Sequence, residues 1–70
     1  MLGVTAKTMA FGMFQGNHEF EAWRQGRGRE AVATLKLSQD GAVVQEREFR
    51  GPSAFGTAIS QGMAWLDLSD

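Results

Sequence analysis

The sequence predicts an α+β domain, in which a three- or four-stranded antiparallel β-meander carries one C-terminal α-helix packed across a face. Two observations predict this class. Glycines divide the first fifty residues into short segments that alternate apolar and polar residues, which is typical of a meander. The last segment instead repeats its apolar residues at helical spacing. We expect one domain over residues 1–70, with strands at about 8–14, 18–24, 31–38 and 42–50 and a helix at about 54–66.

The first predicted strand, residues 8–14, is apolar on both sides. Gly12 and two aromatic residues argue against a helix in this segment, and the chain then turns through residues 15–17. Because a strand with two apolar sides needs cover on both, we expect both sides to be covered. One side carries Met9, Phe11 and Met13, and the other carries Ala10 and Phe14.

The second predicted strand, residues 18–24, alternates more clearly. Phe20 and Ala22 share the side that we expect to face the core, and Trp23 points the other way together with two glutamates. His18 begins this strand, where a single histidine is most often a surface residue, so we expect it to be exposed.

The hairpin around Asp40 and Gly41 joins the third and fourth strands, and two registers compete for it. A two-residue Asp-Gly turn sets Leu35 opposite Glu46. A three-residue loop with Gly41 in the left-handed region instead pairs Leu37 with Val43 and Ala31 with Phe49. The second register places apolar beside apolar side chains, and it is the one that we predict.

Pro52 and Ser53 predict the start of a helix over residues 54–66, and we expect Ser53 to be its N-cap. Small residues one turn apart predict that the sheet or a second helix approaches this helix closely: Ala54, Ala58 and Gly62. The expected apolar stripe consists of Phe55, Ala58, Ile59, Gly62 and Leu66, flanked by Met63 and Trp65.

Composition excludes several classes of protein. The chain has no Cys and a single His, so neither disulfides nor a metal site is expected, and no cofactor motif is present. A net charge of −1 argues against a protein that mimics the DNA backbone. A secretory signal and an apolar stretch of membrane-spanning length are both absent, which predicts a cytoplasmic protein without membrane contact. With disulfides and metal excluded, so small a domain is stabilised either by self-association or by a core that is sufficient alone.

Catalysis is not expected. His18 beside Glu19 or Glu21 is the one pairing that resembles a general base with its orienting carboxylate, and no Ser or Thr lies in a nucleophile-like turn. We therefore expect a non-enzymatic protein.

The segment from Arg24 to Arg29 is the most specific local feature. Three arginines, Arg24, Arg27 and Arg29, are spaced by Gly and Gln in what we expect to be a flexible loop rich in hydrogen-bond donors. Such a loop is either simply solvated, or in contact with a protein, or in contact with a nucleic acid. The sequence leaves these three alternatives open.

Apolar side chains supply further candidate contacts. Met9, Met13 and Trp65 belong either to the core or to an interface, because Met and Trp are common in both. As an interface they favour a homodimer through the first strand or the helix flank. The predicted partner-binding residues are Arg24, Arg27, Arg29, Trp23, Trp65, Met9 and Met13.

One resemblance adds to this reading. The run Asp40-Gly41-Ala42-Val43-Val44, the following Glu46-Arg47-Glu48-Phe49, and Pro52-Ser53 with the helix to Trp65-Leu66 resemble small phage and prophage proteins in which a strand hairpin leads into one amphipathic helix. Several anti-CRISPR proteins are of this type. The resemblance covers about half of the chain and implies an intracellular, non-enzymatic inhibitor that docks on a multi-subunit host defence complex.

Two other functions compete with that role. A three-stranded sheet with one helix is also similar to the plant AP2 domain and to N-terminal domains of phage integrases, whose sheet enters the DNA major groove. Acidic residues on the expected open face oppose DNA binding, because phosphates repel them. The third alternative is a structural or assembly subunit. That open face carries Glu19, Glu21, Trp23, Val32, Thr34, Lys36, Val44, Glu46 and Glu48.

Overall fold

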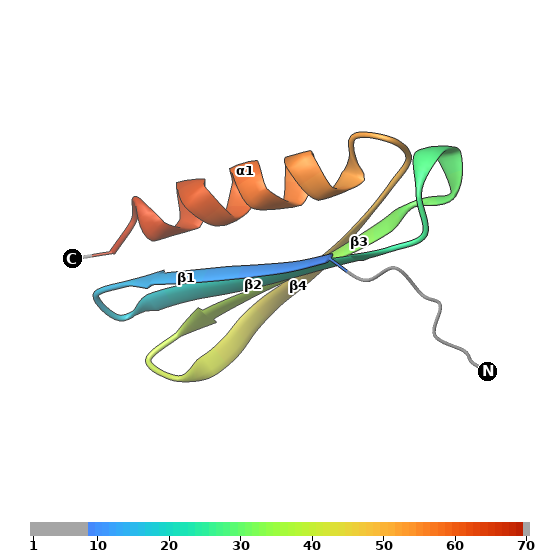
Figure 1. The fold of residues 1–70 in the computed structure, drawn as a ribbon. Coiled ribbons are helices and arrows are strands. Elements are labelled where there is room, and N and C mark those ends of the chain that lie inside the picture. The colour runs from blue at the N-terminus through green and yellow to red at the C-terminus, as the bar shows by residue number, and fades with distance from the viewer. Residues whose placement is uncertain (1–8, 70) are drawn as a thin grey trace.

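The computed structural model describes residues 9–69 and shows two layers, a four-stranded antiparallel sheet and one helix across a single face (Figure 1). The strand order is β1-β2-β3-β4, so each strand pairs with its neighbour in sequence. The predicted α+β meander with a C-terminal helix is therefore confirmed. The elements are β1 (Met9–Gln15), β2 (His18–Gln25), the 3₁₀ turn η1 (Gly28–Glu30), β3 (Val32–Gln39), β4 (Ala42–Arg50) and α1 (Ala54–Leu66).

Element boundaries lie close to the predicted ones. The bounds of β4 and α1 coincide with the predicted ranges, and β2 and β3 are each shifted or extended by one residue. Residue 8, where we expected the first strand to begin, lies outside the described residues.

Two tight turns close the outer hairpins. Gly16 has φ 59° and begins the β1–β2 turn, as a two-residue type II′ connection requires. In the β3–β4 turn both central residues are left-handed, with φ 54° at Asp40 and 83° at Gly41, which is the type I′ geometry. The backbone amide of Asp40 donates to the carbonyl of Asn17 at 2.9 Å, which ties the two turns together.

The predicted register of the β3–β4 hairpin is wrong. The turn has two residues, with Gln39 opposite Ala42, whereas we predicted a three-residue loop. The register then shifts between Leu37 and Ser38 of β3. Val44 of β4 is the extra residue at this point and forms a β-bulge. Beyond the bulge, Leu37 lies opposite Gln45 instead of Val43, and Ala33 instead of Ala31 lies opposite Phe49. Thus a short turn and a bulge together bring Phe49 to the helix side.

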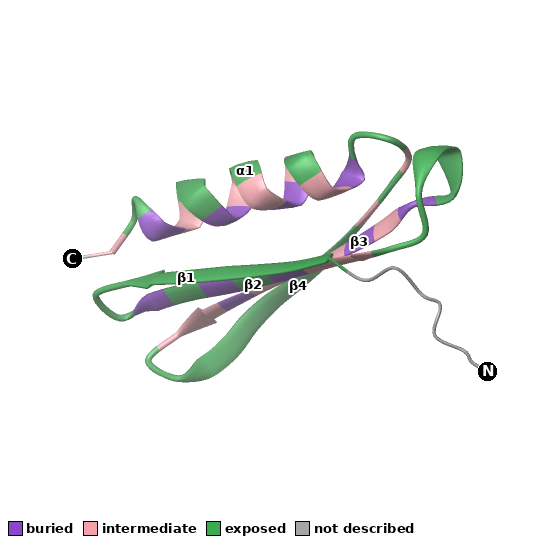
Figure 2. Ribbon diagram, in the orientation of Figure 1, coloured by how far each residue is buried: buried purple, intermediate pink, exposed green. Residues whose placement is uncertain are grey.

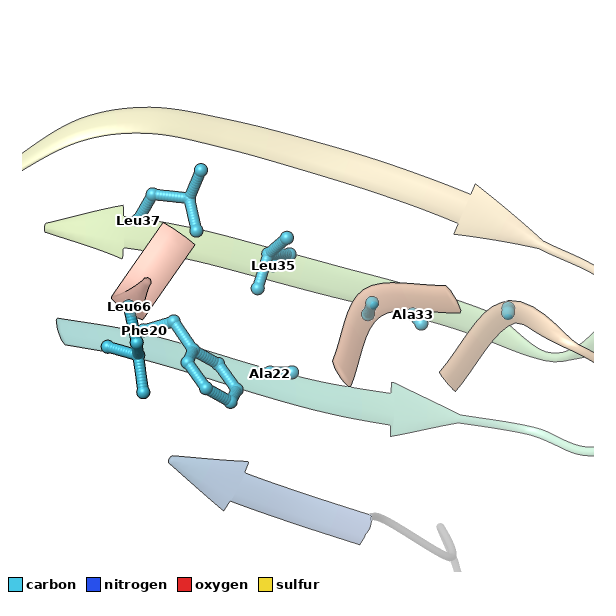
Figure 3. Packing of buried hydrophobic residues seen from close by; sticks show 8 residues of the cluster. Phe20, Ala22, Ala33, Leu35, Leu37 and Leu66 are labelled. Carbon is cyan, nitrogen blue, oxygen red and sulfur yellow. The ribbon is translucent and has the colours of Figure 1, made fainter. Parts of the chain in front are cut away.

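Residues of the two central strands form the floor of the core. Phe20 and Ala22 of β2 face α1, as predicted from their alternation, and so do three residues of β3. Figure 3 shows these side chains between the two central strands and the helix, with Leu66 above Phe20. The buried cluster consists of Phe20, Ala22, Ala33, Leu35, Leu37, Ala54, Ala58 and Leu66.

The helix lies close to the sheet because its buried stripe is made of small residues. Ala54, Ala58 and Gly62 follow one another at one-turn spacing and are all buried. A Cβ atom at Gly62 would lie only 2.5 Å from Cγ of the Phe20 ring. The close approach predicted from these residues is confirmed. Ser53 occupies the N-cap position, although its side chain makes no capping hydrogen bond.

His18 is buried, with 7% of its surface exposed, so the prediction of an exposed histidine is wrong. Its ring lies 4.4 Å, centroid to centroid, from the ring of Trp65. Trp65 in turn donates its indole N–H to the carbonyl of Ser38 at 3.0 Å. Trp65 of the helix thus covers His18 at the start of β2. The local sequence around His18 does not reveal this cover.

Candidate functional site: the uncovered first strand

Strand β1 is exposed along its whole length (Figure 2). The expectation that both of its sides would be covered is not met within the described chain. The exposed fractions are 48% for Met9, 42% for Phe11, 39% for Met13 and 78% for Phe14. We call these four residues the β1 surface. The first three lie on the helix side of the sheet, and Phe14 lies on the open side.

Geometry explains why the helix leaves β1 uncovered. A helix is about 10 Å wide, whereas four strands at about 4.8 Å spacing span more than that. Helix α1 packs mainly on β2 and β3, and far less on the two outer strands. Within the β1 surface, Phe11 packs its ring against a buried aromatic ring. The centroids of the Phe11 and Phe20 rings are 6.0 Å apart.

One flank of the helix continues the β1 surface. Arg47 of β4 donates to the side chain of Gln61, which fixes the Gln61 flank of α1 over β4. The opposite flank, on the β1 side, carries Phe55, Ile59 and Met63, which follow one another at i, i+4 spacing. Met63 is 42% exposed, and the other two are half-buried.

The two edges of the sheet differ in character. The described part of β1, Met9–Gln15, contains no charged residue, no proline and no bulge. Strand β4 carries Glu46, Arg47, Glu48 and Arg50 and is interrupted by the bulge at Val44. Charges and bulges are the means by which natural sheets prevent their edges from pairing with other chains. By this criterion β4 is a protected edge and β1 is not.

Large apolar side chains are distributed unusually between core and surface. Of the nine buried hydrophobic residues among those described, five are alanines, and four are large: Phe20, Leu35, Leu37 and Leu66. Twice as many large hydrophobic residues are exposed, and four of these eight make up the β1 surface. Four large apolar side chains that lie exposed together on one strand are typical of an interaction site.

The three arginines of the predicted loop do not act as one group. Arg24 belongs to β2 and lies on the helix side, half-buried, with its Nε atom buried and without a hydrogen-bond partner. Arg27 and Arg29 are exposed, in and beside the turn η1. Arg50, at the end of β4, pairs with Val32 and so lies at the same end of the sheet. Glu30 of η1 and Glu48, which pairs with Arg50, lie there as well, so basic side chains outnumber acidic ones at this end of the molecule.

The two tryptophans have different surroundings. Trp23 lies on the open face, half-buried, with the Lys36 ammonium 5.4 Å from its ring centre. Trp65 packs against the core and the His18 ring. Of the predicted contact residues, Met9, Met13, Arg27 and Arg29 are the exposed ones, whereas Arg24, Trp23 and Trp65 are half-buried. Phe14 and Met63 were not predicted as contacts, although the two-sided apolar pattern of the first strand pointed to Phe14.

Residues 9–69 contain no cluster of three or more potential metal ligands. The shallow hollow between the β4–α1 loop and the helix lacks titratable side chains; it is lined by Pro52, Ser53, Gly56, Thr57, Ser60 and Gln61. Along the open face, acidic residues outnumber Lys36, and the one ion pair within residues 9–69 is the exposed Arg50–Glu48 pair at 3.3 Å. None of these features gathers groups for acid-base or nucleophilic chemistry.

Within residues 9–69, no helix has the length and apolar character that a membrane span requires. No family model matches the chain, and neither curated proteins nor solved structures show a significant match.

Proposed function

We propose that this chain is a non-enzymatic protein-binding module, and that the β1 surface together with the Met63 flank of α1 is its principal contact. The observation that carries the proposal is the distribution of large apolar side chains, twice as many of which are exposed as buried. Transfer of apolar surface out of water contributes about 25 cal/mol per Å². A partner that covers this surface therefore provides the stabilisation that the small core lacks.

The residue types suit this role. Met and Phe are enriched in the centres of protein interfaces, and Met adapts its shape to the partner. Around them the chain offers charge: Arg27 and Arg29 stand exposed at one end of the sheet. Such rim charges orient a partner and raise the association rate more than they raise affinity.

An intracellular inhibitor that docks on a host defence complex is one specific form of this proposal, and it is the form that the phage-protein resemblance implies. It supposes a cytoplasmic chain whose contact blocks a partner sterically. Its own test is functional: expression in a bacterium with an active defence complex restores phage plaque formation, and variants of the β1 surface lose that effect. Unchanged plaque formation in cells that hold the soluble chain argues against this form.

DNA binding is the second candidate, and the basic end around Arg27, Arg29 and Arg50 is the observation that favours it. The open face opposes it, because Glu19, Glu21, Glu46 and Glu48 lie on that face and would repel phosphates. A shift of duplex DNA that weakens steeply with salt supports this candidate.

Affinity capture with matched variants tests the proposal. The tagged chain is exposed to host lysate, with and without nuclease, and bound proteins are identified by mass spectrometry. We expect one stoichiometric protein that survives nuclease and is lost when Met13 and Met63 are both changed to Ser. The matched control is Val44→Ser, which removes an exposed apolar side chain from β4. Equal capture by all three proteins contradicts the proposed surface. An assembly subunit, the third alternative, instead remains insoluble or oligomeric until its partner is co-expressed.

A further inference from the structure

We propose that the outer edge of β1 pairs with β1 of a second copy of this chain. The two strands run antiparallel across a two-fold axis at Gly12, and the two sheets join into one. The inference rests on the proposed function in taking β1 as a binding surface, and it goes further by naming what binds there. Three independent properties of β1 support it: the direction of its backbone groups, the pattern of its side chains and its lack of charge.

The backbone direction follows from the turn. In a two-residue hairpin, the residues that flank the turn exchange both of their hydrogen bonds, so Gln15 points its backbone groups towards His18 of β2. Alternation then directs the amides and carbonyls of Ala10, Gly12 and Phe14 away from the sheet. An antiparallel partner must present outward groups to outward groups. The register with the greatest overlap that meets this condition places Gly12 opposite Gly12 of the second copy.

The side chains of β1 are complementary to themselves in this register. On the open side, Phe14 of one copy lies opposite Ala10 of the other, and the two glycines between them carry no side chain. Each Phe14 ring, 78% exposed in the single chain, thus has room to lie over the small residues of the other copy. On the helix side, Phe11 of one copy lies opposite Met13 of the other, so four large apolar side chains gather at the axis. Cross-strand pairs of this kind are the main side-chain contribution to sheet stability.

Charge presents no obstacle to this pairing. The seven residues of β1 are uncharged, so a copy that pairs with itself brings no like charges into contact. The nearest acidic residue to the axis is Glu21, which lies opposite Gly12 within the chain. Two Glu21 residues would be separated by three strand spacings, about 14 Å, which exceeds the Debye length of about 8 Å at physiological salt. Pairing through β4 would instead align four charged residues and a bulge in each copy.

Size-exclusion chromatography with light scattering tests this inference on the full chain, at concentrations up to about 1 mM. We expect the mass of two chains, each of 7.6 kDa. Phe14→Lys places a charge at the pairing edge and should raise the dimer dissociation constant at least about tenfold. Ala10→Pro keeps the strand apolar and removes only an outward amide, and it should have a similar effect. Both positions are exposed, so neither change requires the core to rearrange.

Val43→Lys is the matched control, because Val43 is an exposed apolar residue on the opposite edge strand. It should leave the mass of two chains unchanged. A wild-type chain that stays at the mass of one over the whole concentration range overturns the inference. So does a dimer that survives both β1 variants, or one that Val43→Lys disrupts.

The same variants separate this inference from the proposed function. If the chain is a monomer and Met13→Ser with Met63→Ser still abolishes capture of another protein, then the surface binds a protein other than a second copy. In that case the inference fails and the proposed function stands. If the chain is a dimer that captures nothing, the inference stands and the proposed binding of another protein fails.

Discussion

The ring of Phe20 on β2 lies directly against the backbone of Gly62 on α1, where the helix has no side chain. A glycine in the middle of a helix costs about 1 kcal/mol relative to alanine. Here the cost is offset because the Phe20 ring, 1% exposed, occupies the space that a Cβ atom would need. This contact sets the separation of α1 and β2 at Gly62.

The first prediction concerns this contact. Gly62→Ala places a methyl group where the Phe20 ring lies, and should lower the free energy of unfolding by about 1–3 kcal/mol, as overpacking does. Gly56→Ala is the control, since a Cβ atom there meets nothing within 4 Å. The control should stabilise the chain by about 0.5–1 kcal/mol through helix propensity. Urea unfolding followed by circular dichroism measures both. A stabilising effect of Gly62→Ala equal to that of the control would show that the close contact is absent.

The second prediction concerns the β3–β4 turn. Gly41 has φ 83°, a conformation that costs an L-residue about 1–2 kcal/mol, so Gly41→Ala should destabilise the chain by that amount. Asp40→Asn should change the free energy of unfolding little, because Asn is also favoured in the left-handed region of type I′ turns. Equal effects of the two changes in urea unfolding would argue for a turn of another type.

The third prediction concerns Trp65. Trp65→Phe removes the hydrogen bond to the Ser38 carbonyl and should cost about 1 kcal/mol, whereas Trp65→Ala also uncovers His18 and should cost about 3 kcal/mol or more. Thermal unfolding measures both changes. If neither change lowers the melting temperature, Trp65 does not cover His18, and its assignment as a partner contact gains weight.

The fourth prediction separates the arginines. Arg27→Ala with Arg29→Ala should leave the free energy of unfolding within about 0.5 kcal/mol of wild type, because both side chains are exposed surface groups. Arg24→Ala should destabilise the chain, since its half-buried stem packs on the helix side of β2. The double variant is therefore the clean test of the basic end in partner capture. A double variant as destabilised as Arg24→Ala would mean that the three arginines share one structural role.

Much of the fold was predictable because local signals agreed. The alternation around Phe20 and Ala22, the position of the hairpin at Asp40 and Gly41, and the small-residue line of the helix all pointed to one arrangement of elements. The hairpin register was not predictable, because a bulge at Val44 leaves no residue signature and shifts every later pair. His18 was mispredicted because its cover comes from Trp65 on the helix, which is remote in sequence.

The candidate site was predictable in part. Met9 and Met13 were recognised as residues that suit an interface, and the two-sided apolar pattern of the first strand showed that cover was needed. The sequence did not show that the helix would leave β1 uncovered. Which strands a single helix covers depends on where α1 lies over the sheet. The sequence also did not distinguish the burial of Arg24 from that of Arg27 and Arg29. Arg24 lies in β2 on the helix side and is half-buried, whereas the other two are exposed.

Hydrogen exchange of single backbone amides, followed by NMR over a range of protein concentrations, tests the pairing of β1 most directly. The amides of Ala10, Gly12 and Phe14 point away from the sheet, whereas those of Phe11 and Met13 point towards β2. We predict that the three outward amides exchange slowly at high concentration and fast at low concentration, while the inward amides stay slow throughout. The Val43 amide, on the outer side of β4, should exchange fast at every concentration. Exchange of the three outward amides as fast as that of Val43 at all concentrations would contradict the account.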